Sequence, residues 1–383
     1  MAPMFELTDS QALLRDSLAR WLHDAAPFAR RQSLLATPEA IAPLWQGLAG
    51  GPGLLGAALP ESLGGQGGGL ADQGLILQTL GDALLPEPYL ACAVLGAGLL
   101  RRLPGEWPQR LLAGLVDGAV RPVLATLERG ARHDLARVQA RLQTAAVGGQ
   151  ALTTLTGRKA LVRAAPYATH WLVSARDAAG CLRLALVSPG AAGITRRDLR
   201  LTDGGWAAEL AFDATPVEAV LGEPGVDLLA LVEQVSDEAL LVTGAEGVGV
   251  MQRLLRDTLD HVRQRQQFGV AIASFQVVQH RLADMHLALL QANALVGATL
   301  LRLDRETALP AGVRRQAVAS AQVVVARACR SVGQGAVQLH GGMGMTDELF
   351  VGHGFKRLTL IEGLGGGVDA QLHRVADSGA LAG

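Results

Sequence analysis

The feature that most constrains the fold is a long region of helical periodicity after Gly225. Apolar residues recur there three and four positions apart, as on the buried face of an α-helix. A stretch rich in alanine and valine, from about Ala311 to Val337, predicts one further long helix. Helices of this length bury their apolar faces against each other, so the sequence predicts a C-terminal helical bundle. The periodic apolar positions of the first two helices are Met251, Leu254, Leu255, Leu259 and Val262, followed by Phe275, Val278, Leu282 and Met285.

The chain before Gly225 has two different patterns. Residues 7–102 have helical spacing interrupted by glycine-rich loops, and Thr8 with Gln11 forms a capping box at the first helix. Short alternating or β-branched stretches such as His170–Ser174 and Leu182–Val187 follow, separated by glycine-rich turns, and predict a small β-barrel or sandwich. We therefore expect a mainly α protein with an N-terminal helical domain (1–120), a middle β-domain (121–225) and the helical bundle (226–383).

Charge and cysteine content exclude several classes of function. The chain has 34 basic and 35 acidic residues, so no attraction to nucleic acid or to a membrane surface is expected. Cys92, Cys181 and Cys329 are widely separated among apolar neighbours, which predicts reduced thiols rather than a disulfide or a metal site. No signal-like amino terminus is present, and no apolar run reaches the roughly 18 residues of a membrane span. We expect a cytoplasmic protein.

Two stretches have the residue types that a dinucleotide site needs. The first contains Arg265, Gln267, Phe268 and Gly269 and continues to Phe275 and Gln276. The second contains Gln338, His340, Gly341 and Gly342. An arginine neutralises a pyrophosphate, glutamines bond its polar edge, and glycines let backbone amides come close. The spaced set is far more specific than either the Phe-Gly break or the His-Gly-Gly turn alone.

These stretches resemble the flavin-contacting segments of acyl-CoA dehydrogenases, and the resemblance extends over nearly the whole chain. It implies an acyl-CoA dehydrogenase fold with a C-terminal four-helix bundle, FAD as cofactor, an acyl-CoA substrate and an electron-transfer flavoprotein as electron acceptor. It also implies a homo- or hetero-oligomer, a dimer of dimers, in which Arg265 and the Gln338 segment reach the flavin of a neighbouring subunit. The segment around Glu246, with Met-Thr-Asp-Glu-Leu and Phe-Lys-Arg-Leu-Thr further on, looks most like the small subunit of heteromeric pimeloyl-CoA-type dehydrogenases.

The catalytic base is the point at which the chain departs from the family. The resemblance assigns the usual glutamate to Gly365, and a second location known in the family falls on Ala239. Glu246 lies seven residues beyond Ala239, close to two helical turns, and therefore on nearly the same face. In its surroundings of glycine, alanine and valine it is our candidate base. The alternative for Glu246 is a structural carboxylate paired with an arginine of the same or a neighbouring subunit.

Two further expectations concern the cofactor. The family's Thr-Glu-Pro-x-Ala-Gly-Ser-Asp motif becomes Leu127–Asp134 here, which removes expected flavin contacts from the middle domain. Arg129 and Arg132 in this segment are either partners of a CoA phosphate or substrate carboxylate, or plain surface arginines. We expect His340 to line the turn around a partner's flavin rather than to act as acid or base.

The sequence therefore leaves three hypotheses for the function. The first is an FAD-dependent dehydrogenase chain that acts on a long, branched or dicarboxylic acyl-CoA. The second is a non-catalytic partner that completes the flavin site of a heteromeric acyl-CoA dehydrogenase. A flavin oxidase or oxygenase on the same fold is the third and weakest.

Overall fold

The computed structural model describes residues 4–85, 88–147, 150–306 and 308–378. The chain divides into two compact units, and neither is continuous in sequence. A helical unit comprises Met1–Arg31, Gly69–Leu85 and Leu240–Gly383, and a second unit comprises Gln32–Gly68 and Pro86–Ala239. Part of the N-terminal helical region thus belongs with the C-terminal bundle. The three domain boundaries expected from the sequence remain a prediction.

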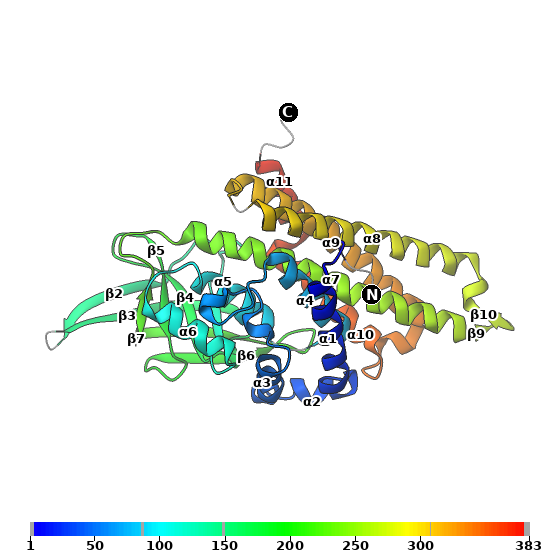
Figure 1. Cartoon of the computed structure of the whole chain (residues 1–383), viewed down its shortest axis with the longest axis horizontal. Helices are drawn as coiled ribbons and strands as arrows, with labels where there is room; N and C mark the ends of the chain where they lie inside the picture. The colour runs from blue at the N-terminus through cyan, green and yellow to red at the C-terminus, as the bar shows by residue number, and fades with distance from the viewer. Residues whose placement is uncertain (1–3, 86–87, 148–149, 307, 379–383) are drawn as a thin grey trace. The chain divides into compact units, whose positions relative to one another are not determined.

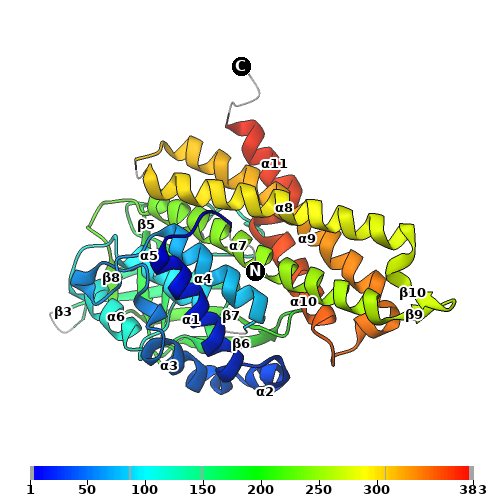
Figure 2. The same cartoon turned by 45° about the vertical axis from the view of Figure 1, so that its right-hand side comes forward.

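The helical unit is built on the long helices that the periodicity predicts. Thr8 caps the first helix: its side chain accepts a hydrogen bond from the backbone of Gln11, which caps Thr8 in return. Figures 1 and 2 show α7, α8 and α9 running side by side. The helices are α1 (Asp9–Ala25), α4 (Leu70–Ala83), α7 (Leu229–Gln264, which begins in the second unit), α8 (Gln276–Arg305), α9 (Ala311–His340), α10 (Phe350–Gly363) and α11 (Gly367–Asp377).

Glycines bring α4 and α7 into backbone contact. A Cβ added at Gly249 would lie 1.9 Å from the carbonyl oxygen of Gln78, and one added at Gly81 would lie 2.3 Å from that of Glu246. No other residue type leaves room for such an approach, because any side chain adds a Cβ. The small residues around Glu246 are therefore explained by helix packing.

The hydropathy of α8 differs from what we expected of the sequence. An 18-residue window of this helix has a mean hydropathy of 1.2, so by length and composition it is able to cross a membrane. One such helix is weak evidence, since the core helix of a bundle meets the same criteria. Here α8 packs along α9 and against α4, which is the environment of a bundle helix.

The second unit contains one mixed eight-stranded sheet, with the order β6-β7-β3-β2-β4-β5-β8 and β1 paired to β4. The pairings of β4 with β1 and β2 are parallel and the others antiparallel. Helices α3 (Ala42–Gly50), α5 (Ala97–Leu100) and α6 (Glu106–Val116) belong to the same unit, and the short α2 (Arg31–Leu35) spans the boundary. The strands are β1 (Pro122–Ala125), β2 (Arg141–Val147), β3 (Gln150–Arg163), β4 (His170–Arg176), β5 (Leu182–Val187), β6 (Ile194–Arg200), β7 (Trp206–Pro216) and β8 (Ala219–Leu221).

The predicted order of helices, strands and helices is confirmed. The strands expected at His170–Ser174 and Leu182–Val187 are β4 and β5, and all six residues of β5 are buried. All three cysteines are free thiols, as expected, but Cys181 is only partly buried whereas Cys92 and Cys329 are buried. Burial raises the pKa of the Cys329 thiol, which keeps that group protonated and unreactive.

Candidate functional site

A two-residue hairpin joins α7 to α8 and contains the first predicted motif. Arg265 follows the end of α7, and β9 (Gln266–Gln267) pairs with β10 (Val270–Ala271). Phe268 and Gly269 form the turn with φ values of 54° and 80°. Positive φ at both central positions is the geometry of a type I′ turn, whose twist matches that of the flanking strands. Phe268 is held in a conformation that is uncommon for a residue with a side chain.

The hairpin presents polar and aromatic groups to solvent. Arg265, Gln267 and Gln276 are exposed, and Phe268 is 93% exposed although it is a large apolar side chain. Phe275 meets the Phe268 ring edge-on, with 6.2 Å between centroids. In the described part of the chain Arg265 forms no ion pair with a carboxylate. An unpaired guanidinium beside an exposed aromatic ring is a suitable surface for a planar anionic ligand or a second subunit.

The second predicted motif lies at the end of α9, beside the end of α7. His340 is buried and its Nδ1 lies 2.9 Å from the carbonyl oxygen of Ala336. Its ring stacks on that of His261 with 4.2 Å between centroids. Burial lowers the pKa of His261, and the neighbouring His340 and Arg265 lower it further. The stack therefore brings the ends of α7 and α9 together. Local sequence patterns do not predict this contact, because the two histidines are 79 residues apart.

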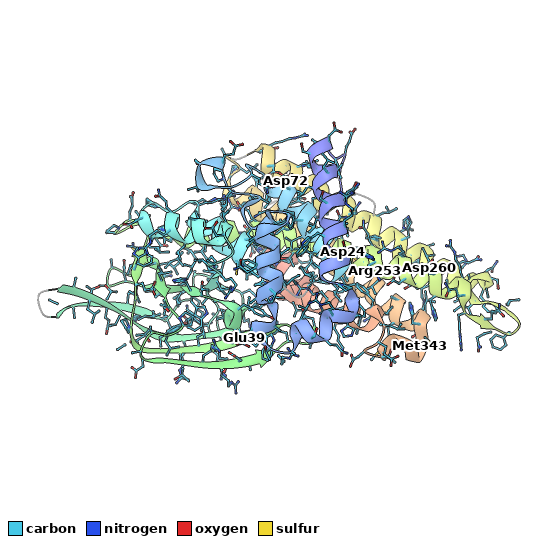
Figure 3. The ribbon with its side chains drawn as sticks, turned by 60° about the horizontal axis from the view of Figure 1, so that its bottom comes forward. Asp24, Glu39, Asp72, Arg253, Asp260 and Met343 are labelled. Carbon is cyan, nitrogen blue, oxygen red and sulfur yellow. The ribbon has the colours of Figure 1, made fainter. Side chains whose placement is uncertain are left out.

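The glycine turn η8 (Gly341–Met345) that follows α9 is open. A Cβ added at Gly341 or Gly342 would have no atom within 4 Å, and both residues are exposed. Gln338, one turn earlier, is exposed as well. Gly341 has a φ of 61°, which favours glycine. Figure 3 shows Met343 in this turn, and Arg253 and Asp260 along α7. The backbone amides of the turn can thus be approached closely by another molecule.

Glu246, the candidate base, is held by an arginine. Both carboxylate oxygens accept hydrogen bonds from Arg357 of α10, at 2.6 Å from Nε and 2.7 Å from Nη2. Glu246 is 6% exposed. Each carboxylate oxygen of Glu246 is thus engaged by the same guanidinium group, as in a structural ion pair. The geometry favours the structural alternative for Glu246, and its assignment as base stays a prediction.

The position that the family resemblance assigns to the base is closed. Gly365 lies in the turn η9 (Leu364–Gly366) with a φ of 63°. A Cβ there would lie 2.7 Å from Nε2 of Gln371 and 2.9 Å from Cδ2 of Leu240. The Gln371 amide also donates a 2.6 Å hydrogen bond to the Gly365 carbonyl. Glu362, the nearest carboxylate in sequence, is bound by Arg330.

The motif Leu127–Asp134 of the second unit is organised around Glu128. Its carboxylate accepts a 2.7 Å hydrogen bond from Nζ of the fully buried Lys159 and binds the backbone amides of Gln139 and Ala140. Arg129 pairs with Glu209 at 2.6 Å. Neither pair is predictable from local sequence patterns, because the partners lie 31 and 80 residues apart.

The groups exposed by the hairpin and by the η8 turn are of the kinds that FAD would need. The free guanidinium of Arg265, the exposed amides of Gln267 and Gln276 and the open glycines at 341 and 342 suit a pyrophosphate and the polar edge of a flavin. No group of three or more metal-ligating side chains is found among the described residues. The donors exposed by the hairpin and by the glycine turn are of the kinds that suit an organic anion.

Comparisons with known proteins show which family the chain belongs to. The family model described as "Acyl-CoA dehydrogenase, C-terminal domain" matches residues 230–379. The chain is 32% identical over 332 residues to "Acyl-CoA dehydrogenase FadE27" of Mycobacterium tuberculosis, and the matched region covers 84% of each protein.

Two solved structures are similar over 98% of both chains. The Tcur3481-Tcur3483 steroid ACAD variant has a TM-score of 0.85 at 28% identity. The ChsE4-ChsE5 complex from Mycobacterium tuberculosis has a TM-score of 0.83 at 27% identity. The chain belongs to the acyl-CoA dehydrogenase family.

Proposed function

We propose that this chain is the partner subunit of a heteromeric, FAD-dependent acyl-CoA dehydrogenase, and that it completes a flavin site on a neighbouring subunit without a catalytic base of its own. The observation that carries the proposal is the contrast between the open turn at Gly342 and the closed turn at Gly365. The backbone of the first turn is open to another molecule, whereas the position for an internal base is filled.

The residues of the hairpin and of the η8 turn would each have a distinct role toward the neighbour's flavin. Arg265 would neutralise the pyrophosphate, and the amides of Gly341 and Gly342 would donate hydrogen bonds to it. Gln267 and Gln276 would bond the polar edge, and the exposed Phe268 ring would exclude water from the contact. FAD, when bound, supplies the hydride acceptor for oxidation of an acyl-CoA thioester, with an electron-transfer flavoprotein downstream.

The pairing of the two carboxylates considered for the base, Glu246 and Glu362, supports a non-catalytic role. Glu246 and Glu362 are both bound by arginines within the same unit, and Gly365 has no side chain. Two of the similar structures reported above have two named components, ChsE4-ChsE5 and Tcur3481-Tcur3483. By analogy the base would come from the partner chain. One of these similar structures is described as a steroid ACAD, which favours a bulky acyl group as the substrate of our proposed assembly. This agrees with the long or branched substrates expected from the sequence.

The direct test uses two preparations: this chain purified alone, and this chain purified together with the protein encoded beside it. Flavin absorbance per chain and acyl-CoA turnover are measured for both. We expect stoichiometric flavin and turnover only in the assembly. A yellow, active preparation of this chain alone would refute the proposal.

A pair of arginine variants locates the contact within the assembly. Arg265→Ala should weaken flavin retention by roughly tenfold or more, because one charge-assisted hydrogen bond is lost. Arg263→Ala is the matched control, since Arg263 is exposed two residues earlier at the end of the same helix. Equal flavin retention in the two variants would remove Arg265 from the site.

The rival hypothesis, catalysis by Glu246 itself, rests on the burial of this carboxylate in an apolar stretch. It predicts that Glu246→Gln abolishes turnover in an assembly that is fully folded and fully loaded with flavin. Under our proposal, the turnover per bound flavin is unchanged in that variant. The ratio of turnover to bound flavin therefore separates the two hypotheses.

A further inference from the structure

The two stacked histidine rings at the ends of α7 and α9 connect the hairpin to the η8 turn. The backbone amide of Arg265 donates a 2.8 Å hydrogen bond to the His261 carbonyl, so the hairpin begins one helical turn after this histidine. The η8 turn folds back closely on the other ring, because a Cβ added at Gly344 would lie 3.1 Å from the Cβ of His340. The rings are 4.2 Å apart between centroids, with an interplanar angle of 22°. The stack therefore links the Arg265 segment to the turn that begins at Gly341.

The two rings differ in their hydrogen bonds. A carbonyl oxygen only accepts, so Nδ1 of His340 donates to the Ala336 carbonyl at 2.9 Å, which fixes the tautomer of this buried ring. The ring nitrogens of His261, which is partly buried, form no hydrogen bond in the part of the chain that the structure describes. A proton that binds to His261 thus adds a charge to the stack, and no acceptor among the described residues compensates it.

The charges around His261 oppose its protonation. Burial lowers the pKa of His261, and His340 of α9 and Arg265 lower it further. No carboxylate among the described residues offsets these effects. Asp257, one turn earlier on α7, is engaged by Nε of Arg253 at 2.8 Å from each oxygen. The balance of charge at the stack is therefore positive.

The other titratable groups near these helix ends do not change that balance. His353 and Lys356 of α10 both contact Asp347, which lies beyond the η8 turn. Exposed charged groups on the last turns of α7 and the first turns of α8 form no ion pair within the described ranges and do not act on His261. They are Asp260, Arg263, His280, Arg281 and Asp284. An anion bound at Arg265 would therefore be the first negative charge close to the stack.

We propose that His261 is a positioning residue that couples the flavin pyrophosphate to a proton: binding of the anion at Arg265 is accompanied by protonation of His261, and each strengthens the other. The inference rests on the proposed function, which assigns the pyrophosphate to Arg265. Because the guanidinium opposes a proton on His261, an anion that neutralises the guanidinium removes this opposition. Linkage requires the converse, so the protonated imidazole raises the affinity for the anion by the same factor. Solvent supplies the proton, at most one for each anion bound.

The pH dependence of the affinity has a definite sign. At about pH 8 the imidazole is neutral with or without the anion, so the coupling is absent. As the pH falls below about 6.5, the state with bound anion takes up the proton first, and the affinity rises. The pyrophosphate of FAD is a diester whose charge is constant over this range. A change in FAD affinity therefore reports a group of the protein.

The test is calorimetric titration of the flavin-free assembly with FAD, at about pH 8 and at about pH 5.5. We expect the Kd to be about fivefold lower at the lower pH, which is the low end of the usual coupling between two sites. Titrations in two buffers of different ionisation enthalpy should show proton uptake on binding at the lower pH only. His261→Phe keeps an aromatic ring in the stack but cannot bind a proton, so it should abolish both the affinity change and the uptake. His286→Phe, at an exposed histidine of α8 outside the stack, is the matched control and should keep both.

The outcomes separate this inference from the proposed function. An assembly that binds no FAD at either pH refutes the proposed function, and this inference with it. FAD binding of equal affinity at both pH values, or a pH response that His261→Phe retains, overturns this inference alone. If His261→Phe does not assemble, proton NMR of the unmodified assembly decides. The pKa of His261 should rise when FAD is added, and a titration that FAD leaves unchanged would overturn the coupling.

Discussion

The two glycine turns of the helical unit have opposite surroundings. At Gly342 no atom lies within 4 Å of an added Cβ, whereas at Gly365 the same atom would meet Gln371 and Leu240 at less than 3 Å. The open turn stands beside exposed hydrogen-bonding groups, and the closed turn lies where a catalytic side chain is expected. The difference supports our proposal that the chain offers one turn to another subunit and has no room for a catalytic side chain at the other.

The largest effect should come from Glu246, which we take to be structural. Glu246→Ala leaves the largely buried Arg357 guanidinium without its carboxylate and should lower the free energy of unfolding by about 3 kcal/mol. Urea denaturation measures this change. Replacing both partners, by Glu246→Gln with Arg357→Met, should recover most of the loss, because a neutral pair has no uncompensated charge. A loss of turnover in Glu246→Ala at unchanged stability would instead support a catalytic role.

Gly365→Ala tests whether the second turn is closed. The new Cβ is strained at a φ of 63° and collides with Leu240 and Gln371. We expect a loss of about 2 kcal/mol in unfolding free energy, from left-handed strain and overpacking together. Thermal and urea unfolding give the value. An unchanged midpoint would mean that the turn has room for a side chain.

Gly342→Ala is the matched change at the open turn. Gly342 does not have a positive φ, and its exposed Cβ position is empty, so stability should change by less than about 0.5 kcal/mol. Flavin retention in the assembly should nevertheless fall, because the methyl group would stand between the backbone amide and the ligand. If the variant destabilises the chain as Gly365→Ala does, the contrast between the two turns is wrong.

The smallest effect concerns pH. Burial, His340 and Arg265 lower the pKa of His261, so the folded state binds its proton less readily than the unfolded state does. The unfolding free energy should therefore fall as pH drops below about 6.5, and the contribution is fully present above that value. The effect is small because His261 is only partly buried. Proton NMR titration should show a higher pKa for His261 in Arg265→Ala, and His261→Gln should flatten the pH dependence of unfolding.

Much of the fold followed from the sequence because local patterns determine it. The apolar spacing from Met251 to Val262 depends only on helix geometry, and the Thr8 capping box depends on residues three apart. The site was predictable only in part. Arg265 and Gly341 were identified by a resemblance, but the arginine that holds Glu246 lies 111 residues away. The filling of the turn at Gly365 depends on a backbone angle and on two neighbours that only the folded chain brings together.

The crowding at Gly365 also has an evolutionary consequence. A glutamate introduced there by one mutation would meet two occupied neighbours and an unfavourable backbone angle. Recovery of an independent enzyme would need coordinated replacement of Leu240 and Gln371, and each intermediate along that route would be less stable than the present chain. For the non-catalytic partner that we propose, this crowding makes the loss of a base hard to reverse stepwise, and such a chain is expected to remain dependent on a companion gene.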